Sequence, residues 1–324
     1  MTRRFSIVDA HHHVWNPDVN YHPWLRDRPV SGFRYGDYAS IRRRYLVPDY
    51  LADARNFHVA GSVYVEAEWD PNDPVGEMDY IAALRRESGY PSVAVGQIWL
   101  DRADAAQTIE RLTDFDFVRS VRQKPRANAS PADRTAGGMT ERRWRDGFAQ
   151  LRSRGLRFDL QTPWWHLHEA AALARDFPDT QIIINHTGLP ADRSADGLGA
   201  WRAAMARVAE CPNVAVKISG IGVPGQAWTA DANRAVVMTT IALFGVERCM
   251  FASNFPVDSL CASFDEIFEG FAAITVEFSP DERQRLFHHN AMRIYAIPSG
   301  WLAEPSDPLI PAQAGIQSQI RRSG

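Results

Sequence analysis

The chain has 324 residues, of which 45% are hydrophobic, and it carries a formal net charge of -3 with a pI near 6.4. This apolar fraction is ample for a large core, and without a basic block the sequence excludes nucleic acid and anionic membranes as partners. The three cysteines form no CxxC pair and no uncharged apolar run approaches the roughly 18 to 20 residues of a membrane helix, so we expect a cytoplasmic protein without disulfides.

The first apolar run, Phe5 to Val8, predicts a buried strand, and His11 and His13 follow it two residues apart. Alternate residues of an extended chain point to the same side, so both imidazoles can bind one metal ion. Asp9 is close enough in sequence to orient a ring N–H. Runs of histidine also occur in purification tags, but a tag rarely follows a strand this directly or stops at three residues. The rest of the chain has to decide whether this motif is a ligand pair.

A long irregular segment, roughly Asn16 to Val47, comes next and contains several aromatic residues among prolines and arginines. Loops of this length are uncommon and tend to be lids or binding loops. We expect most of the aromatic side chains to pack the loop onto the rest of the protein. We assign Trp24 to substrate binding.

Beyond this loop, strand patterns alternate with helical patterns. The predicted strands are 59–66, 92–100, 117–122, 156–160, 181–186, 214–218 and 249–254, and the predicted helices are 48–56, 74–88, 103–113, 140–154, 166–177, 201–210, 230–244, 263–275 and 280–296. Eight such units predict an α/β fold, a single (β/α)8 TIM barrel with a long first βα loop. The alternative is an open doubly wound sheet, but no GxGxxG follows the first strand.

The last residues lose this periodicity and are rich in Pro, Ser and Gln. The sequence therefore divides into a barrel over residues 1–300 and an unstructured C-terminal extension over residues 301–324.

Polar residues stand where the predicted strands end, a position that core packing does not explain. They are His11, His13, Glu66, Arg122, His186, Lys217 and Asn254. Because the carboxyl ends of all strands meet at one mouth of a barrel, these side chains are expected to surround a single site. Each of them has an alternative explanation as a polar residue at a solvated strand end, above all Glu66, and the same holds for Gln97 in the third predicted strand.

Six segments share their order with a known family. They are Asp9 to Trp15, Val121 to Gln123, Asn185 to Pro190, Val216 to Gly220, Ser253 to Pro256 and Asn290 to Tyr295. In this order the chain, from about Phe5 to Ile297, resembles the amidohydrolase superfamily in its lactonase-like branch of metal-dependent TIM-barrel hydrolases. Relatives in this branch open sugar-acid lactones or lactones from aromatic-ring breakdown, and others in the wider group decarboxylate aromatic acids.

The resemblance implies a mononuclear or metal-free site in which His11, His13 and His186 converge. The metal would be one divalent ion, zinc in preference to manganese, which activates a water and polarises the substrate carbonyl. Arg122 and Lys217 would hold the substrate carboxylate or the developing oxyanion, with Glu66 also on the substrate side.

One position departs from the family pattern. Strand eight of the superfamily usually carries an aspartate that binds metal and moves the proton, and this chain has Asn254 there. An amide accepts hydrogen bonds but cannot act as a general base. Asp258 and Glu66 are the candidate replacements, and Asp258 is preferred because its loop leaves the same strand end.

Three functions follow from the sequence. The first is hydrolysis, by an activated water, of a lactone or related cyclic ester of a small sugar acid or aromatic-degradation intermediate. The second is metal-dependent decarboxylation of a small unsaturated or aromatic acid. The third is a barrel that binds a small acid without turnover, which Asn254 keeps open. The expected partner is a small carboxylate or lactone, and a homo-oligomer is left open.

Overall fold

Eight short parallel strands pair in sequence order in the computed structural model, which describes residues 6–304. The strands are β1 (Ser6–His12), β2 (His58–Val65), β3 (Val93–Gln97), β4 (Val118–Gln123), β5 (Arg157–Leu160), β6 (Ile182–Ile184), β7 (Val214–Ile218) and β8 (Cys249–Phe251). The ring closes just beyond β8, where the Asn254 N–H donates to the His11 carbonyl at 2.8 Å and the His13 N–H to that of Phe255 at 2.7 Å. The predicted (β/α)8 barrel is confirmed.

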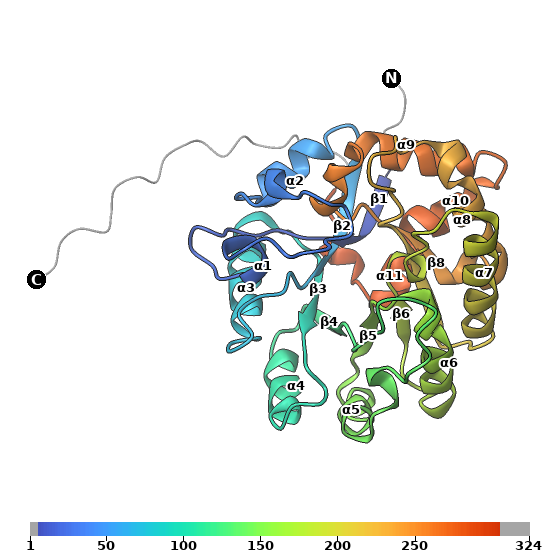
Figure 1. The fold of residues 1–324 in the computed structure, drawn as a ribbon. Coiled ribbons are helices and arrows are strands. Elements are labelled where there is room, and N and C mark those ends of the chain that lie inside the picture. Colours follow the sequence, from blue (N-terminus) through green and yellow to red (C-terminus); the bar gives the residue numbers. More distant parts are fainter. Residues whose placement is uncertain (1–5, 305–324) are drawn as a thin grey trace, which may run out of the picture.

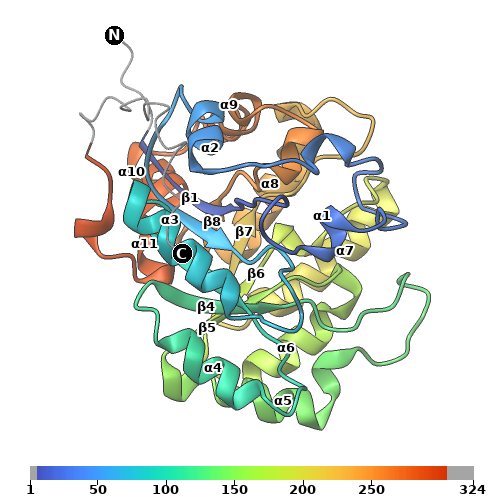
Figure 2. The ribbon, with the colours of Figure 1, turned by 90° about the vertical axis from the view of Figure 1, so that its left-hand side faces the viewer.

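The helices surround this ring of strands (Figure 1, Figure 2). They are α2 (Val47–Asp53), α3 (Gly76–Ser88), α4 (Ala105–Thr113), α5 (Arg142–Phe148), α6 (Leu167–Asp176), α7 (Ala195–Ala209), α8 (Ala230–Phe244), α9 (Phe264–Ile274), α10 (Pro280–Gln284) and α11 (Asn290–Tyr295). None of the helices within residues 6–304 has the length and apolarity needed to cross a membrane.

The barrel interior is apolar in the half where the strands begin. It is filled from alternate strand positions by Val8, Ala10, Val63, Val65, Val93, Val95, Ile183, Ala215, Met250 and Ala252. Tyr295 of α11 joins this cluster and closes the end at which the strands begin. Since apolar residues occupy this end, polar side chains on the same inward faces gather at the end where the strands stop.

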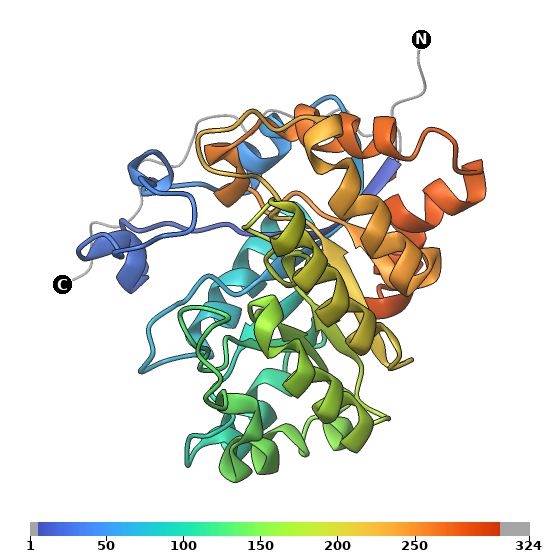
Figure 3. The same ribbon diagram turned by 45° about the vertical axis from the view of Figure 1, so that its right-hand side comes forward.

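The segment between β1 and α2 contains a short helix, α1 (Pro23–Arg26), and stands out from the barrel in Figure 3. Its base is closed by two backbone hydrogen bonds between Trp15 and Tyr45, at 2.8 and 2.9 Å. The predicted long first βα loop is therefore confirmed.

Several element boundaries differ from the sequence prediction. β1 runs to His12 and not to Val8, and α7 begins at Ala195, where Ser194 caps it by accepting the Gly197 N–H. The helix predicted over 140–154 ends at Phe148. The predicted C-terminal extension lies outside the described residues from 305 on. Within residues 301–304, the Ala303 N–H donates to the Ala60 carbonyl at 2.7 Å, so the chain is still docked there.

Candidate active site

The histidines of β1 separate into an inward pair and an outward ring. A register shift against β2 between Asp9 and His12 turns His11 and His13 toward the barrel interior. The ring of His12 faces away, stacks on Tyr50 with ring centroids 4.3 Å apart and pairs with the Ser62 hydroxyl at 3.0 Å. Only alternate members of the histidine run therefore face the site, as the extended backbone predicts.

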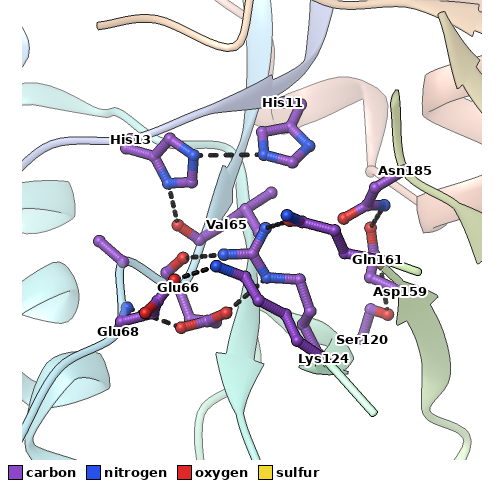
Figure 4. A network of polar contacts seen from close by, with 12 residues as sticks. His11, His13, Val65, Glu66, Glu68, Ser120, Lys124, Asp159, Gln161 and Asn185 are labelled. Atoms are coloured by element: carbon purple, nitrogen blue, oxygen red, sulfur yellow. Dashed lines mark hydrogen bonds and ion pairs between the residues drawn. The ribbon is translucent and has the colours of Figure 1, made fainter. Parts of the chain in front are cut away.

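The inward pair has converging nitrogens. His11 Nε2 and His13 Nε2 lie 3.2 Å apart (Figure 4), and the Nδ1–H of His13 donates to the Val65 carbonyl at 2.7 Å. That bond leaves Nε2 of His13 as the lone-pair nitrogen. His11 Nδ1 is buried without a hydrogen-bond partner among the described residues. Burial lowers the pKa of both rings. The charge of Lys217 lowers the pKa of His11 further, and the charge of Arg122 lowers the pKa of both.

His186 reaches the same place from β6. Its backbone lies in the left-handed region with φ of 53°, which turns the ring back inward directly after the inward Asn185. The ring centroid lies 4.7 Å from that of His11, and Nδ1 pairs with the Ser219 hydroxyl at 3.0 Å. A left-handed residue other than glycine costs roughly 1–3 kcal/mol, and such strain concentrates at functional sites.

The β1 pair fits a divalent cation. Two ligands of a tetrahedral zinc ion, each about 2.0–2.1 Å from the metal, are about 3.3 Å apart, close to the observed separation of the two Nε2 atoms. Within residues 6–304, however, no three His, Cys, Asp or Glu side chains are arranged to hold an ion together. The His11–His13 pair is thus the part of the expected ligand set that is in place.

Asp9 does not orient a histidine ring, contrary to the expectation from its position. Its carboxylate accepts hydrogen bonds from the Ser253 N–H at 2.8 Å, the Ser253 hydroxyl at 2.6 Å and the Tyr50 hydroxyl at 2.9 Å. Burial raises its pKa to about 6. Asp9 therefore ties β1 to the end of β8, which holds the barrel closed beside the histidines.

Arg122 and Glu66 form a buried ion pair at the mouth. Arg122 Nε lies 2.5 Å from Glu66 Oε1, Nη2 donates to the Glu66 carbonyl at 2.6 Å, and Nη1 to Gln161 Oε1 at 3.2 Å (Figure 4). Each side chain is only 3% exposed. Burial alone would lower the pKa of Arg122, but Glu66 raises it, so the guanidinium stays charged beside the histidines.

Lys217 lies deeper in the barrel than the sequence suggests. Its Nζ is 2.7 Å from Asp159 Oδ1 and 5.0 Å from the Tyr295 ring centre, and the side chain is fully buried. Asp159 also accepts from the Ser120 hydroxyl at 2.7 Å and the Asn185 amide at 2.9 Å. The charge of Lys217 is therefore paired with Asp159, and the contact of Lys217 with substrate stays a prediction.

The Lys217 site predicts a pH-dependent contribution to stability. Burial lowers the folded-state pKa of Lys217 from 10.5 to about 8, so between these values the unfolded chain is protonated and the folded chain is not. Stability should therefore rise with pH across this range, relative to Lys217→Met. Chemical unfolding of both proteins across the range measures the difference. Lys124→Met, at an exposed position, is the control, and parallel curves for Lys217→Met and wild type would contradict the assignment.

Asn254 and Asp258 meet at the end of β8. The Asn254 amide N–H donates to Asp258 Oδ1 at 2.6 Å, and the Tyr35 hydroxyl donates to the same oxygen at 2.8 Å. The Gly220 N–H donates to Asp258 Oδ2 at 3.1 Å. Burial raises the pKa of Asp258, and the nearby charge of Arg34 and these hydrogen bonds oppose the rise. Asp258 thus joins β7, β8 and the first loop, and orients the Asn254 amide.

Arg34 is a site residue that sequence reasoning did not find. Its Nη2 donates to the Tyr35 hydroxyl at 2.6 Å, and its charge contributes to lowering the pKa of His186, after burial. A Cβ at Gly220, where φ is 59°, would lie 2.5 Å from His186 Nδ1 and 2.9 Å from Arg34 Nη2. Arg34 and His186 therefore face each other across a position that only glycine fits.

Trp24 lies at the edge of this site. Its indole N–H donates to the Ala67 carbonyl at 2.8 Å, and the side chain lines a cavity that Glu66 and Arg122 also line. This cavity adjoins the buried ion pair on the side of β2 to β4.

A parallel barrel with imidazoles, a guanidinium and carboxylates at the carboxyl ends of its strands is the architecture of a TIM-barrel enzyme. The family model described as amidohydrolase matches residues 8–297. The chain therefore belongs to the amidohydrolase family and is a hydrolase-type enzyme of that family.

Known relatives cover nearly the whole chain. An uncharacterized protein, y4mH, of Sinorhizobium fredii is 41% identical over 90% of this chain and 99% of its own length. L-fucono-1,5-lactonase of Burkholderia multivorans is 26% identical over 93% of this chain and 97% of its own length. A crystal structure of a Burkholderia multivorans amidohydrolase with bound zinc superposes with a TM-score of 0.73 at 24% identity, covering 90% of this chain and 99% of that one.

Proposed function

We propose that the chain hydrolyses the ring ester of a small lactone, with a sugar-acid lactone as the substrate class. The observation that carries the proposal is the convergence of two buried imidazole nitrogens, 3.2 Å apart, beside the buried Arg122 at the barrel mouth. The similarity to an L-fucono-1,5-lactonase supports the lactone. The zinc in the related crystal structure supports a divalent cation.

His11 and His13 would hold that cation, zinc in preference to manganese, with His186 as the third ligand. When bound, the ion polarises the carbonyl and lowers the pKa of a water. The low pKa values of the three rings keep them neutral, which ligation requires.

The remaining groups act on the water and on the substrate. Asp258 accepts the proton of the attacking water, and the Asn254 amide oxygen orients that water. The water oxygen bonds to the carbonyl carbon, the ring C–O bond breaks and the proton passes to the leaving ring oxygen, so a hydroxy acid forms. Arg122 stabilises the oxyanion, and the positive charge of Lys217, deeper in the barrel, adds to this stabilisation. Trp24 and Glu66 border the rest of the substrate.

Elemental analysis of the untagged protein, with assays on sugar-acid lactones and a 2-pyrone, tests the proposal. We expect about one equivalent of zinc in the wild type and in His168→Ala, whose ring is exposed, and a loss of metal in His11→Ala. Lactone turnover should fall with the metal, by a factor on the order of 10³ or more.

The other outcomes separate the alternatives. Metal-independent turnover would leave a lactonase that works without a cation. Release of carbon dioxide from aromatic acids, with inert lactones, would replace the proposal by decarboxylation. Binding of small acids without turnover of either substrate class would leave a binding barrel.

A further inference from the structure

A cavity of about 630 Å³ lies beside the histidines, where the loops after β2, β3 and β4 meet the first loop. Glu66 and Arg122 belong both to its lining and to the candidate active site, whereas the three histidines lie outside the lining. Pockets of about 300 to 1,000 Å³ enclose ligands of drug size. This cavity is therefore larger than a single six-membered lactone ring requires.

Three half-buried indoles line the cavity, and each also contacts another part of the protein. Trp24 is hydrogen-bonded to the Ala67 carbonyl, and Trp69 packs edge-on against the ring of His22 with centroids 5.1 Å apart. The guanidinium of Arg102 lies over Trp99 at 5.2 Å. Because these contacts hold the rings in place, little side-chain entropy is lost when a ligand ring packs against them.

Gln97 adds a hydrogen-bond acceptor without a donor to the same lining. It is the last residue of β3 and follows the inward Val93 and Val95 at the same alternation, so its side chain also faces inward. It is only 7% exposed, and its Oε1 has no hydrogen-bond partner among the described residues. A buried amide oxygen in this state can accept a hydrogen bond from a ligand donor, such as a hydroxyl group.

The charges of the lining balance. The acidic members are Asp27, Glu66 and Glu68, and the basic members are Arg28, Arg122 and Lys124. Two pairs are already formed, Glu66 with Arg122 and Glu68 with Lys124. A balanced and internally paired lining does not attract a polyanion, and it favours a neutral ligand that carries hydroxyl groups.

We infer that this cavity is a subsite for a neutral carbohydrate ring, so that the lactone substrate carries a second sugar residue beyond the ring that opens. The indoles cover the C–H faces of the second ring, and Gln97 accepts a hydrogen bond from one of its hydroxyl groups. The inference rests on the proposed lactonase function and extends it to the size and class of the substrate.

Calorimetric titration of the full-length protein with neutral disaccharides, cellobiose, maltose and lactose, tests the subsite without turnover. We expect at least one of them to bind. Trp99→Ala and Gln97→Leu should each weaken that binding by roughly three- to tenfold. Trp301→Ala is the matched control, because Trp301 packs near the start of β3 at the other end of the barrel, and should bind as the wild type does.

Thermal unfolding of each variant establishes that it is folded. The inference is overturned if none of the three disaccharides binds, if folded Trp99→Ala and Gln97→Leu bind as tightly as the wild type, or if a planar aromatic acid displaces the sugar and binds more tightly. Turnover of monosaccharide lactones without disaccharide binding would keep the proposed function and remove the subsite. Trp99-dependent disaccharide binding without any lactone turnover would keep the subsite and remove the proposed lactonase function.

Discussion

Replacing Arg122 by alanine is expected to destabilise the fold by about 3 to 5 kcal/mol, because it leaves the Glu66 carboxylate buried without its partner. The guanidinium makes three hydrogen bonds, two to Glu66 and one to Gln161, and both members of the ion pair are 3% exposed. Lactone turnover should also be lost, since the charge that faces the substrate is removed. Denaturant unfolding and steady-state kinetics measure the two effects.

The double variant Glu66→Gln/Arg122→Met separates them. It removes both charges together, so no carboxylate is left unpaired, and most of the lost stability should return. Activity should stay low, because the positive charge at the mouth is still absent. A double variant as unstable as Arg122→Ala would mean that the packing of the guanidinium, and not its charge, holds this region.

The barrel could be predicted from sequence because the signals are local. Apolar runs such as Ile182–Ile184 alternate with helical patterns, and strand order follows from chain order in a parallel barrel. The gathering of polar residues from the strand ends at one mouth of the barrel could be predicted too, since it depends only on the fold. Helix starts were less predictable: α7 begins at Ala195 because the Ser194 hydroxyl caps it, six residues before the apolar stripe predicted from Trp201.

The partners of the site residues could not be predicted, because they come from distant parts of the chain. Arg34 is one of several arginines in the first loop, and nothing in its local sequence marks it as the one that faces His186. Asp159 reads as an ordinary strand residue, although it fixes the charge of Lys217. The His186 ring faces the site because its backbone is left-handed. The alternation of side chains along a strand does not predict such a conformation.

Replacing Asp258, whose carboxylate lies beside Asn254 just beyond β8, is expected to have the second large effect. Asp258 Oδ1 now accepts from the Asn254 amide and the Tyr35 hydroxyl, and Oδ2 accepts from the Gly220 N–H. Asp258→Asn turns one of these oxygens into an NH2 donor, so at least one buried donor is left unpaired at a cost of about 1–3 kcal/mol. If Asp258 is the general base, kcat/KM should fall by on the order of 10² to 10⁴. Unfolding and kinetic measurements on the same sample give both values.

Asn254→Asp should be impaired for the opposite reason. It would place two carboxyl groups where amide nitrogen and carboxylate oxygen are now 2.6 Å apart, and like charges at this distance force one group to hold a proton. The exchanged double variant, Asn254→Asp/Asp258→Asn, restores one amide and one carboxylate with the hydrogen bond reversed. We expect it to be more stable than either single variant.

The activity of the exchanged variant then decides what Asp258 does. Recovery of turnover above that of Asp258→Asn would mean that a carboxylate at either position can take the proton. The general base of this chain would then be Asp258 in the loop after β8, in place of the aspartate that the family usually has at position 254. Recovered stability without recovered turnover would mean that the base must stand at residue 258. Unchanged kcat/KM in Asp258→Asn itself, with a lower free energy of unfolding, would reduce Asp258 to a residue that positions Asn254 and Tyr35.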